Sequence, residues 1–299
     1  MADVEVARST RRNVCEERAF VLSAVGIASN LVRDGTFFVL TVDEMDAQAA
    51  SAHLRQYELE SRPAPPPPPP PRLHPYAWIG SLGYGLVLLA VAFANSAGAW
   101  RLDAFDVGEL HGARVRSGQW WRIWTALTLH VDGPHLGANL AAGVWFGYLA
   151  GRLLGAGRAW ALVVIGAGAA NWTEAQFGPP EHRAVGASTA VFTALGLLAA
   201  YSWAYSWLQA RRTGIRAGVS WAYRWGPLVA GVVLLGWTGS EGEETDLVGH
   251  ALGFVVGAIL GAGICAPLAA RSLERIPQWA AGLFALSVVT AAWARALVS

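Results

Sequence analysis

The stretch GASTAVFTALGLLAAYSWAYSWL, residues 186–208, decides how this chain folds, because it is long and apolar enough to cross a membrane. A polar residue, Ser188, lies at its start, and a second apolar stretch, GHALGFVVG at residues 249–257, contains His250. Polar and ionisable groups at membrane depth are costly, so they usually face a polar cavity and mark a function. A hydroxyl and an imidazole are the minimum parts of a nucleophile and its general base. The two residues are therefore a candidate catalytic dyad.

The composition of the whole chain also indicates a membrane protein. Of 299 residues, 54% are hydrophobic and only 14% are charged, against about 25% charged in soluble proteins. The chain has 15 Trp and 34 Gly, residues that are enriched at membrane interfaces and in membrane helices respectively. A net charge of +1 argues against nucleic acid as a partner. Cys15 and Cys265 are too few for a disulfide framework or a thiolate metal site, so we expect no metal and no cofactor.

Apolar windows of membrane-spanning length recur from residue 77 onward and predict seven helical spans. The segment 100–129, between the first and second windows, is rich in Trp but too polar to span. The predicted spans are residues 77–97, 135–154, 159–173, 187–208, 226–239, 246–267 and 279–297.

Before these windows the chain has a different character. Residues 1–62 hold many of the charges and predict a small cytoplasmic α/β domain, with a helix over 11–27, a strand over 36–42 and a helix over 43–59 that Asp43 caps. Such a unit could be regulatory or simply an anchor, and it lacks the apolar core of a cleaved signal peptide. Residues 63–75 form a linker whose seven prolines, 65–71, predict a semi-rigid spacer of roughly 20 Å. A plain spacer is favoured over a binding segment for an SH3-like partner.

The charges of the short loops predict the orientation of the membrane domain, residues 76–299. Arginines such as Arg152, Arg158 and Arg211 fall on one side, and the acidic run 241–246 falls on the other. Because positive loops stay in the cytoplasm, the N-terminus is expected inside and the C-terminus outside. The arginines of segment 100–129 lie on the outer side and depart from this bias.

With this topology, polar groups from three predicted helices lie at one depth, below the outer surface. His135 and Asn139 are four residues apart and share one helix face, while Pro134 suits the first turn of that helix. Both side chains can donate hydrogen bonds, as an oxyanion hole requires. Gly253 and Gly257 lie on the face of His250, where small residues allow a second helix to approach closely.

From about residue 76 to residue 296, the chain resembles the rhomboid intramembrane serine proteases. Gly186-Ala187-Ser188 resembles the Gly-x-Ser nucleophile motif of that family, although Thr189 stands where the family usually has Gly. His250 with Gly253 and Gly257 resembles its base helix. Further motifs that resemble the family are His130, His135 and Asn139 of the second span, the pair Trp121-Arg122 of the first long loop, and Phe192, where the family has an aromatic residue against the histidine.

The resemblance implies a polytopic α-helical bundle of six helices plus a seventh at the C-terminus (6+1), in a bacterial-type inner membrane and in contact with lipid. It implies cleavage of single-span membrane proteins within or near their transmembrane segment. Ser188 would attack and His250 would take its proton, and the Ser188 N–H would hold the oxyanion together with His135 and Asn139. Because Glu181 and Asp246 fall in predicted loops, we expect a dyad rather than a triad.

The remaining motif residues are assigned structural roles. We expect Trp121 and Arg122 to set the first loop at the lipid surface and His130 to support the site. Glu174, Glu181 and His182 are expected to be solvated loop residues.

Two other functions compete with the protease. A catalytically silent relative, a binding or quality-control membrane protein on the same fold, would usually lack the serine or the histidine, and this chain has both. A transporter or metal-handling protein could use His130, His135 and His250. Against it, there is no His-Glu-x-x-His motif, no thiolate cluster and no acidic residue inside a predicted span.

Overall fold

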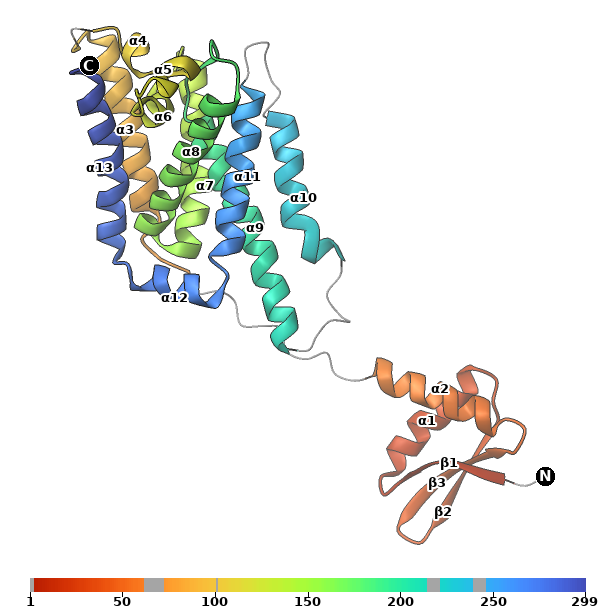
Figure 1. The fold of residues 1–299 in the computed structure, drawn as a ribbon. Helices are drawn as coiled ribbons and strands as arrows, with labels where there is room; N and C mark the ends of the chain where they lie inside the picture. The colour runs from red at the N-terminus through yellow and green to blue at the C-terminus, as the bar shows by residue number, and fades with distance from the viewer. Residues whose placement is uncertain (1–2, 62–72, 101, 214–220, 239–245) are drawn as a thin grey trace. The chain divides into compact units, whose positions relative to one another are not determined.

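The computed structural model describes residues 3–61, 73–100, 102–213, 221–238 and 246–299. The chain forms two compact units, residues 1–67 and 68–299 (Figure 1). The prolines 65–71, predicted as a spacer, lie outside the described residues.

The first unit is a three-stranded antiparallel sheet with two helices. Its strands have the order β1-β3-β2. Both predicted helices and the predicted strand are present, and two further strands, β1 and β2, were not predicted. The prediction that Asp43 caps the second helix was wrong, because Asp43 ends β3, where it pairs with Asp3, and the N-cap residue of α2 is Asp46. The elements are β1 Asp3–Ser9, α1 Arg12–Ala24, β2 Ser29–Asp34, β3 Phe37–Asp43 and α2 Ala47–Glu60.

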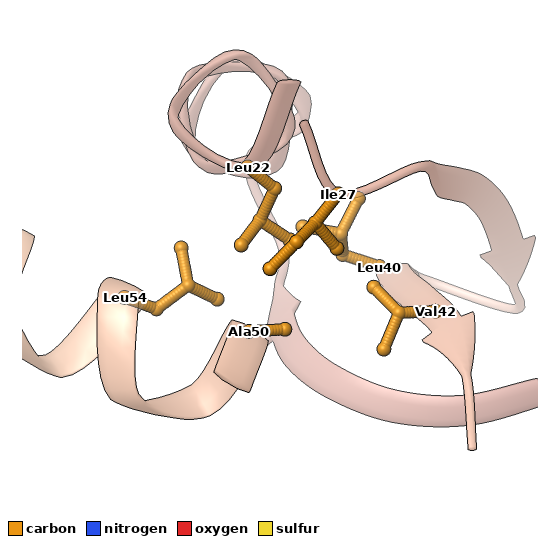
Figure 2. Packing of buried hydrophobic residues seen from close by; sticks show 6 residues of the cluster. All are labelled: Leu22, Ile27, Leu40, Val42, Ala50 and Leu54. Atoms are coloured by element: carbon orange, nitrogen blue, oxygen red, sulfur yellow. The ribbon is translucent and has the colours of Figure 1, made fainter. Parts of the chain in front are cut away.

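The hydrophobic core of this unit is small and lies between the two helices and one face of the sheet. Leu40 and Val42 are two residues apart on β3, so they point to the same face of the sheet. There they meet Leu22 of α1 and Leu54 of α2, and all four side chains are buried (Figure 2). The unit therefore has a hydrophobic core of its own.

The second unit is a bundle of long helices that correspond to the seven predicted windows (Figure 1). By length and composition alone, three of the described helices could cross a membrane, or four if α11 and the following α12 (Pro267–Arg275), bent by 94°, are one broken span. The sequence did not predict α12 as a separate helix. The long helices are α3 Trp78–Ser96, α7 Gly133–Leu154, α8 Ala156–Phe177, α9 Ser188–Thr213, α10 Trp221–Thr238, α11 Leu247–Gly263 and α13 Gln278–Ala296.

The Trp-rich segment between α3 and α7 does not span but folds into short helices at one end of the bundle, while α12 lies at the opposite end (Figure 1). A two-residue strand within it, β4 Leu110–His111, pairs with β5 Arg183–Ala184, which precedes α9. This pairing fastens the segment beside the start of α9. The short helices are α4 Ala104–Gly108, α5 Gly112–Arg116, α6 Arg122–Thr125 and the 3-10 helix η1 Ala126–Thr128.

Helices α9 and α11 are in contact along a row of glycines. A Cβ atom built on Gly257 would lie 2.1 Å from the carbonyl oxygen of Thr193, and one on Gly261 would lie 2.3 Å from that of Leu197. From the other side, a Cβ on Gly196 would lie 2.0 Å from the carbonyl oxygen of Phe254. Real Cβ atoms do not approach this closely, so only glycine permits the two backbones to touch.

Candidate active site

Ser188 is the first residue of α9 and follows a tight turn that requires glycine. Gly186 has φ +126°, a conformation that side chains rarely adopt, and its N–H donates to the carbonyl oxygen of Ala126 at 3.0 Å. A Cβ atom at Gly186 would lie 2.8 Å from His135 Nε2 and 3.7 Å from Ser188 Oγ. The absent side chain thus lets the His135 imidazole pack against this turn, on the side where the serine hydroxyl lies.

His250 lies in the first turn of α11 and is 7% exposed. Its ring packs on Phe192, one turn beyond Ser188 on α9, with centroids 4.5 Å apart and planes inclined by 35°. One turn further along α11, a Cβ on Gly253 would lie 2.6 Å from the carbonyl oxygen of Thr189. The glycine contact therefore brings the His250 end of α11 to the Ser188 end of α9.

Thr189, the residue that departs from the rhomboid pattern, is buried in this contact. Its Cγ2 would lie 3.3 Å from a Cβ at position 253, so the threonine methyl group packs where Gly253 has no side chain. The Thr189 carbonyl oxygen accepts a hydrogen bond from Thr193 Oγ1 at 2.7 Å. The extra volume of threonine is thus accommodated by the glycine opposite.

His135 and Asn139 lie in the first two turns of α7, as the sequence predicted for that helix. Asp132 caps it by accepting from the His135 N–H at 2.7 Å, and Pro134 occupies the first turn. Asn139 is 6% exposed, and its Nδ2 donates to the carbonyl oxygen of His135 at 3.0 Å. An amide nitrogen has two hydrogens, so one remains to donate elsewhere. His135 packs against Gly186, whereas the hydrogen bond from Asn139 Nδ2 stays within its own helix.

His130 contacts the nucleophile turn directly. It lies between η1 and α7, and its Nε2 accepts a hydrogen bond from the Ala187 N–H at 3.3 Å. Burial, and then the neighbouring His135, lowers the pKa of His130 to about 4, so its imidazole is neutral and can accept. The rings of His130 and His135 pack edge to face, 5.0 Å apart. His130 is therefore placed to orient both Ala187 and His135.

The prediction that Trp121 and Arg122 lie at the lipid surface was wrong, because both are buried, at 3% and 2% exposure. Arg122 donates from its guanidinium to the carbonyl oxygens of Asp106 at 2.6 Å and Glu109 at 2.8 Å, and to Gln119 Oε1 at 2.6 Å. Trp121 Nε1 donates to the carbonyl oxygen of Val107 at 3.0 Å. The pair fastens the short helices of the Trp-rich segment together, because a planar guanidinium can serve several carbonyl oxygens at once.

The prediction that Glu174 is a solvated loop residue was also wrong, whereas His182 lies in the connection after α8, as predicted, but is only partly exposed. Glu174 lies in the last turns of α8 and is 3% exposed, and its Oε1 is 3.2 Å from Nε2 of the partly buried His182. Glu181 is exposed, as predicted. One signal in the sequence could have indicated this cluster: Asp246 directly precedes an apolar run, as an N-cap residue does.

Asp246 joins the same cluster from the start of α11. Its Oδ1 accepts from the Gly249 N–H at 2.9 Å, which caps the helix that carries His250, and lies 3.8 Å from His182 Nε2. The neighbouring carboxylates of Asp246 and then Glu174 raise the pKa of His182 to about 10. Burial alone would raise the pKa of Asp246, but the neighbouring His182 and the hydrogen bond from the Gly249 N–H hold it below its usual range.

Comparison with known proteins adds to this geometry. The Rhomboid domain family matches residues 117–267 of the chain. Rhomboid protease GluP of Bacillus subtilis (strain 168) is 28% identical over 169 residues, which make up 56% of this chain and 31% of that relative. The chain thus matches less than a third of the length of that relative. The family match and the apolar helices together indicate an integral membrane protein with several spans. The chain belongs to the rhomboid family.

Proposed function

We propose that this protein is an intramembrane serine protease with Ser188 as nucleophile and His250 as general base. The observation that carries the proposal is that the Ser188 hydroxyl and the His135 imidazole meet at one turn: the point where a Cβ of Gly186 would stand lies 2.8 Å from His135 Nε2 and 3.7 Å from Ser188 Oγ. A reacting carbonyl group needs a place within reach of both a nucleophile and an oxyanion donor. The family match and the named protease relative support the same reaction class.

In the proposed reaction, Ser188 Oγ attacks the carbonyl carbon of a peptide bond while His250 takes the hydroxyl proton. The negative charge on the carbonyl oxygen is stabilised by His135, the second amide hydrogen of Asn139 and the Ser188 N–H at the start of α9. The tetrahedral intermediate then collapses, the C–N bond breaks, and His250 gives the proton to the leaving amine. Water, activated by His250 in turn, hydrolyses the acyl-enzyme and regenerates Ser188.

The surroundings of the dyad support these roles. Phe192 holds the His250 ring from one side, with centroids 4.5 Å apart, and His130 holds the Ala187 N–H. Asp246 contacts the backbone of α11 and the His182 side chain. We therefore assign it to the helix cap and propose a dyad of Ser188 and His250 rather than a triad. Positioning of this kind matters because a misplacement of about 1 Å can cost about 10²-fold in rate.

We further propose the 6+1 arrangement, with α13 as the added helix, in a bacterial-type inner membrane. The loop arginines favour an N-terminus in the cytoplasm and a C-terminus outside. The substrates would be single-span membrane proteins that reach the site through the lipid, cut within or near the spanning segment. Residues 1–62 would form a separate cytoplasmic domain.

Labelling with a fluorophosphonate tests the proposal. The purified full chain in detergent is expected to react, Ser188→Ala is expected to abolish the label, and Ser202→Ala, which changes another serine of α9, is expected to retain it. The same three proteins are then incubated with a single-span test substrate, and only Ser188→Ala should lose cleavage. Label that persists in Ser188→Ala, or that never forms on the wild-type protein, would contradict the assignment and favour a catalytically silent relative.

A further inference from the structure

Three side chains of metal-ligating type meet beside the start of α11. Glu174 comes from the last turns of α8, His182 from the connection that follows, and Asp246 from the residue before α11. Glu174 Oε1 is 3.2 Å from His182 Nε2, and His182 Nε2 is 3.8 Å from Asp246 Oδ1. One ligand atom from each residue lies within 4.8 Å of the others. Neither the dyad nor the oxyanion donors include any of the three.

Glu174 provides a second and independent indication of a ligand. Its side chain is 2% exposed, and among the residues that the structure describes no donor forms a hydrogen bond with its Oε2. A buried carboxylate oxygen without a partner is costly. A Cβ at Gly249 would lie 2.9 Å from this Oε2 and 2.3 Å from Asp246 Oδ2, so both carboxylates turn an oxygen toward the same point. Two carboxyl groups that converge in this way need a cation or a shared proton between them.

The spacing of the ligand atoms suits a small transition-metal ion. Zinc binds nitrogen and oxygen ligands at about 2.0–2.2 Å in tetrahedral geometry, which places neighbouring ligand atoms about 3.3 Å apart. The observed separations of 3.2 and 3.8 Å lie close to this value. Two carboxylates and a neutral imidazole also balance the charge of a divalent cation. The Gly249 N–H, which donates to Asp246 Oδ1 at 2.9 Å, would orient that ligand as outer-shell donors do.

We propose that Glu174, His182 and Asp246 form a binding site for one divalent cation, with Zn²⁺ as the fitting ion, that joins the end of α8 to the start of α11. His182 and Asp246 side chains are 26% and 18% exposed, so the ion has a route from solvent. A bound ion would hold the first turn of α11, where His250 lies. Asp246 also lines the same small opening as Ser188, which places the site beside the proposed active site without sharing its residues.

A proton competes with the ion for this site. With a proton on His182, the imidazolium forms ion pairs with the two carboxylates and supplies the positive charge that a metal ion would otherwise provide. Binding of the metal then releases that proton, as is general for histidine ligands. Metal analysis distinguishes the metal-bound site from the ion pair, because the ion pair contains no metal. Removal of a ligand side chain is a further check, because zinc binding requires all three residues.

The experiment measures zinc binding in the Ser188→Ala full chain, untagged, in detergent and stripped with a chelator that is then removed. This background cannot cut itself, and its metal content does not depend on proteolysis, so failure of the zinc site and failure of the proposed protease are separate results. Equilibrium dialysis against Zn²⁺, with metal analysis, is expected to give about one ion per chain. The same dialysis against Mg²⁺ and Ca²⁺ is expected to give weaker binding, since these ions prefer all-oxygen sites.

Three variants and one matched control complete the test. Glu174→Gln, His182→Ala and Asp246→Asn are each expected to weaken Zn²⁺ binding at least about tenfold and to remove the rise in unfolding temperature that zinc causes. Asparagine keeps the helix cap, so Asp246→Asn should still fold. Glu181→Gln removes an exposed neighbouring carboxylate and should bind as the parent does. No saturable zinc binding by the parent, or equal binding by parent and all three variants, overturns the proposal.

Discussion

The glycine contact between α9 and α11 predicts effects of different size for three glycine-to-alanine substitutions in α11, because the added methyl group would meet different atoms at each position. A Cβ on Gly253 would lie 2.6 Å from the Thr189 carbonyl oxygen, one on Gly257 would lie 2.1 Å from that of Thr193, and one on Gly263 would have nothing within 4 Å. Ordinary contact begins at 3.4 Å. The helices would thus have to separate by about 0.8 Å for Gly253→Ala and about 1.3 Å for Gly257→Ala.

These displacements have two expected consequences. Overpacking of this kind costs about 1–3 kcal/mol of the free energy of unfolding, and the cost should be greater for Gly257→Ala than for Gly253→Ala. Because a shift of about 1 Å between catalytic groups can cost about 10²-fold, cleavage should fall by roughly that factor for both variants. Gly263→Ala, on the same helix, should change neither property.

The assays are thermal unfolding of the purified variants and cleavage of a single-span test substrate at a temperature where all three are folded. Wild-type melting and wild-type cleavage for Gly253→Ala and Gly257→Ala would refute the close contact itself. Loss of stability with unchanged cleavage would leave the contact intact but refute the placement of Ser188 and His250 across it.

Two further predictions concern buried polar residues. Arg122→Lys should lower the free energy of unfolding by about 2–4 kcal/mol, because a lysine lacks the planar fork that reaches the two carbonyl oxygens and the amide oxygen of Gln119 together. The control is Arg271→Lys, at an exposed position. Equal melting temperatures of the two variants would contradict the role of Arg122 in holding the short helices together. Thr189→Gly, which restores the usual rhomboid residue, should lower stability by about 1–2 kcal/mol through lost packing and added backbone freedom. It should not raise the rate of substrate cleavage, and a marked gain in rate would mean that threonine holds the two helices apart.

The sequence predicted those features that depend on neighbouring residues alone. Apolar length predicts a long helix because backbone polar groups in lipid must be satisfied within it, and helices cover all seven windows. The start of α7 follows from Pro134, which suits the first turn of its own helix. The glycines after His250 likewise predicted the close approach of α11 to a second helix, which the structure shows to be the helix that begins at Ser188.

Only the tertiary structure decided which polar side chains are buried. Glu174 reads as a solvated residue at a helix end, and it is buried because the start of α11, far along the chain, lies against it with Asp246. Trp121 and Arg122 read as surface anchors, and they are buried because residues 106–119 fold around them. From the sequence alone, Thr189 is too large for its position beside the nucleophile; in the structure it is accommodated because Gly253 faces it. In each case the deciding partner lies outside the residue's own helix, and the cost of burying the side chain depends on that partner rather than on the local pattern.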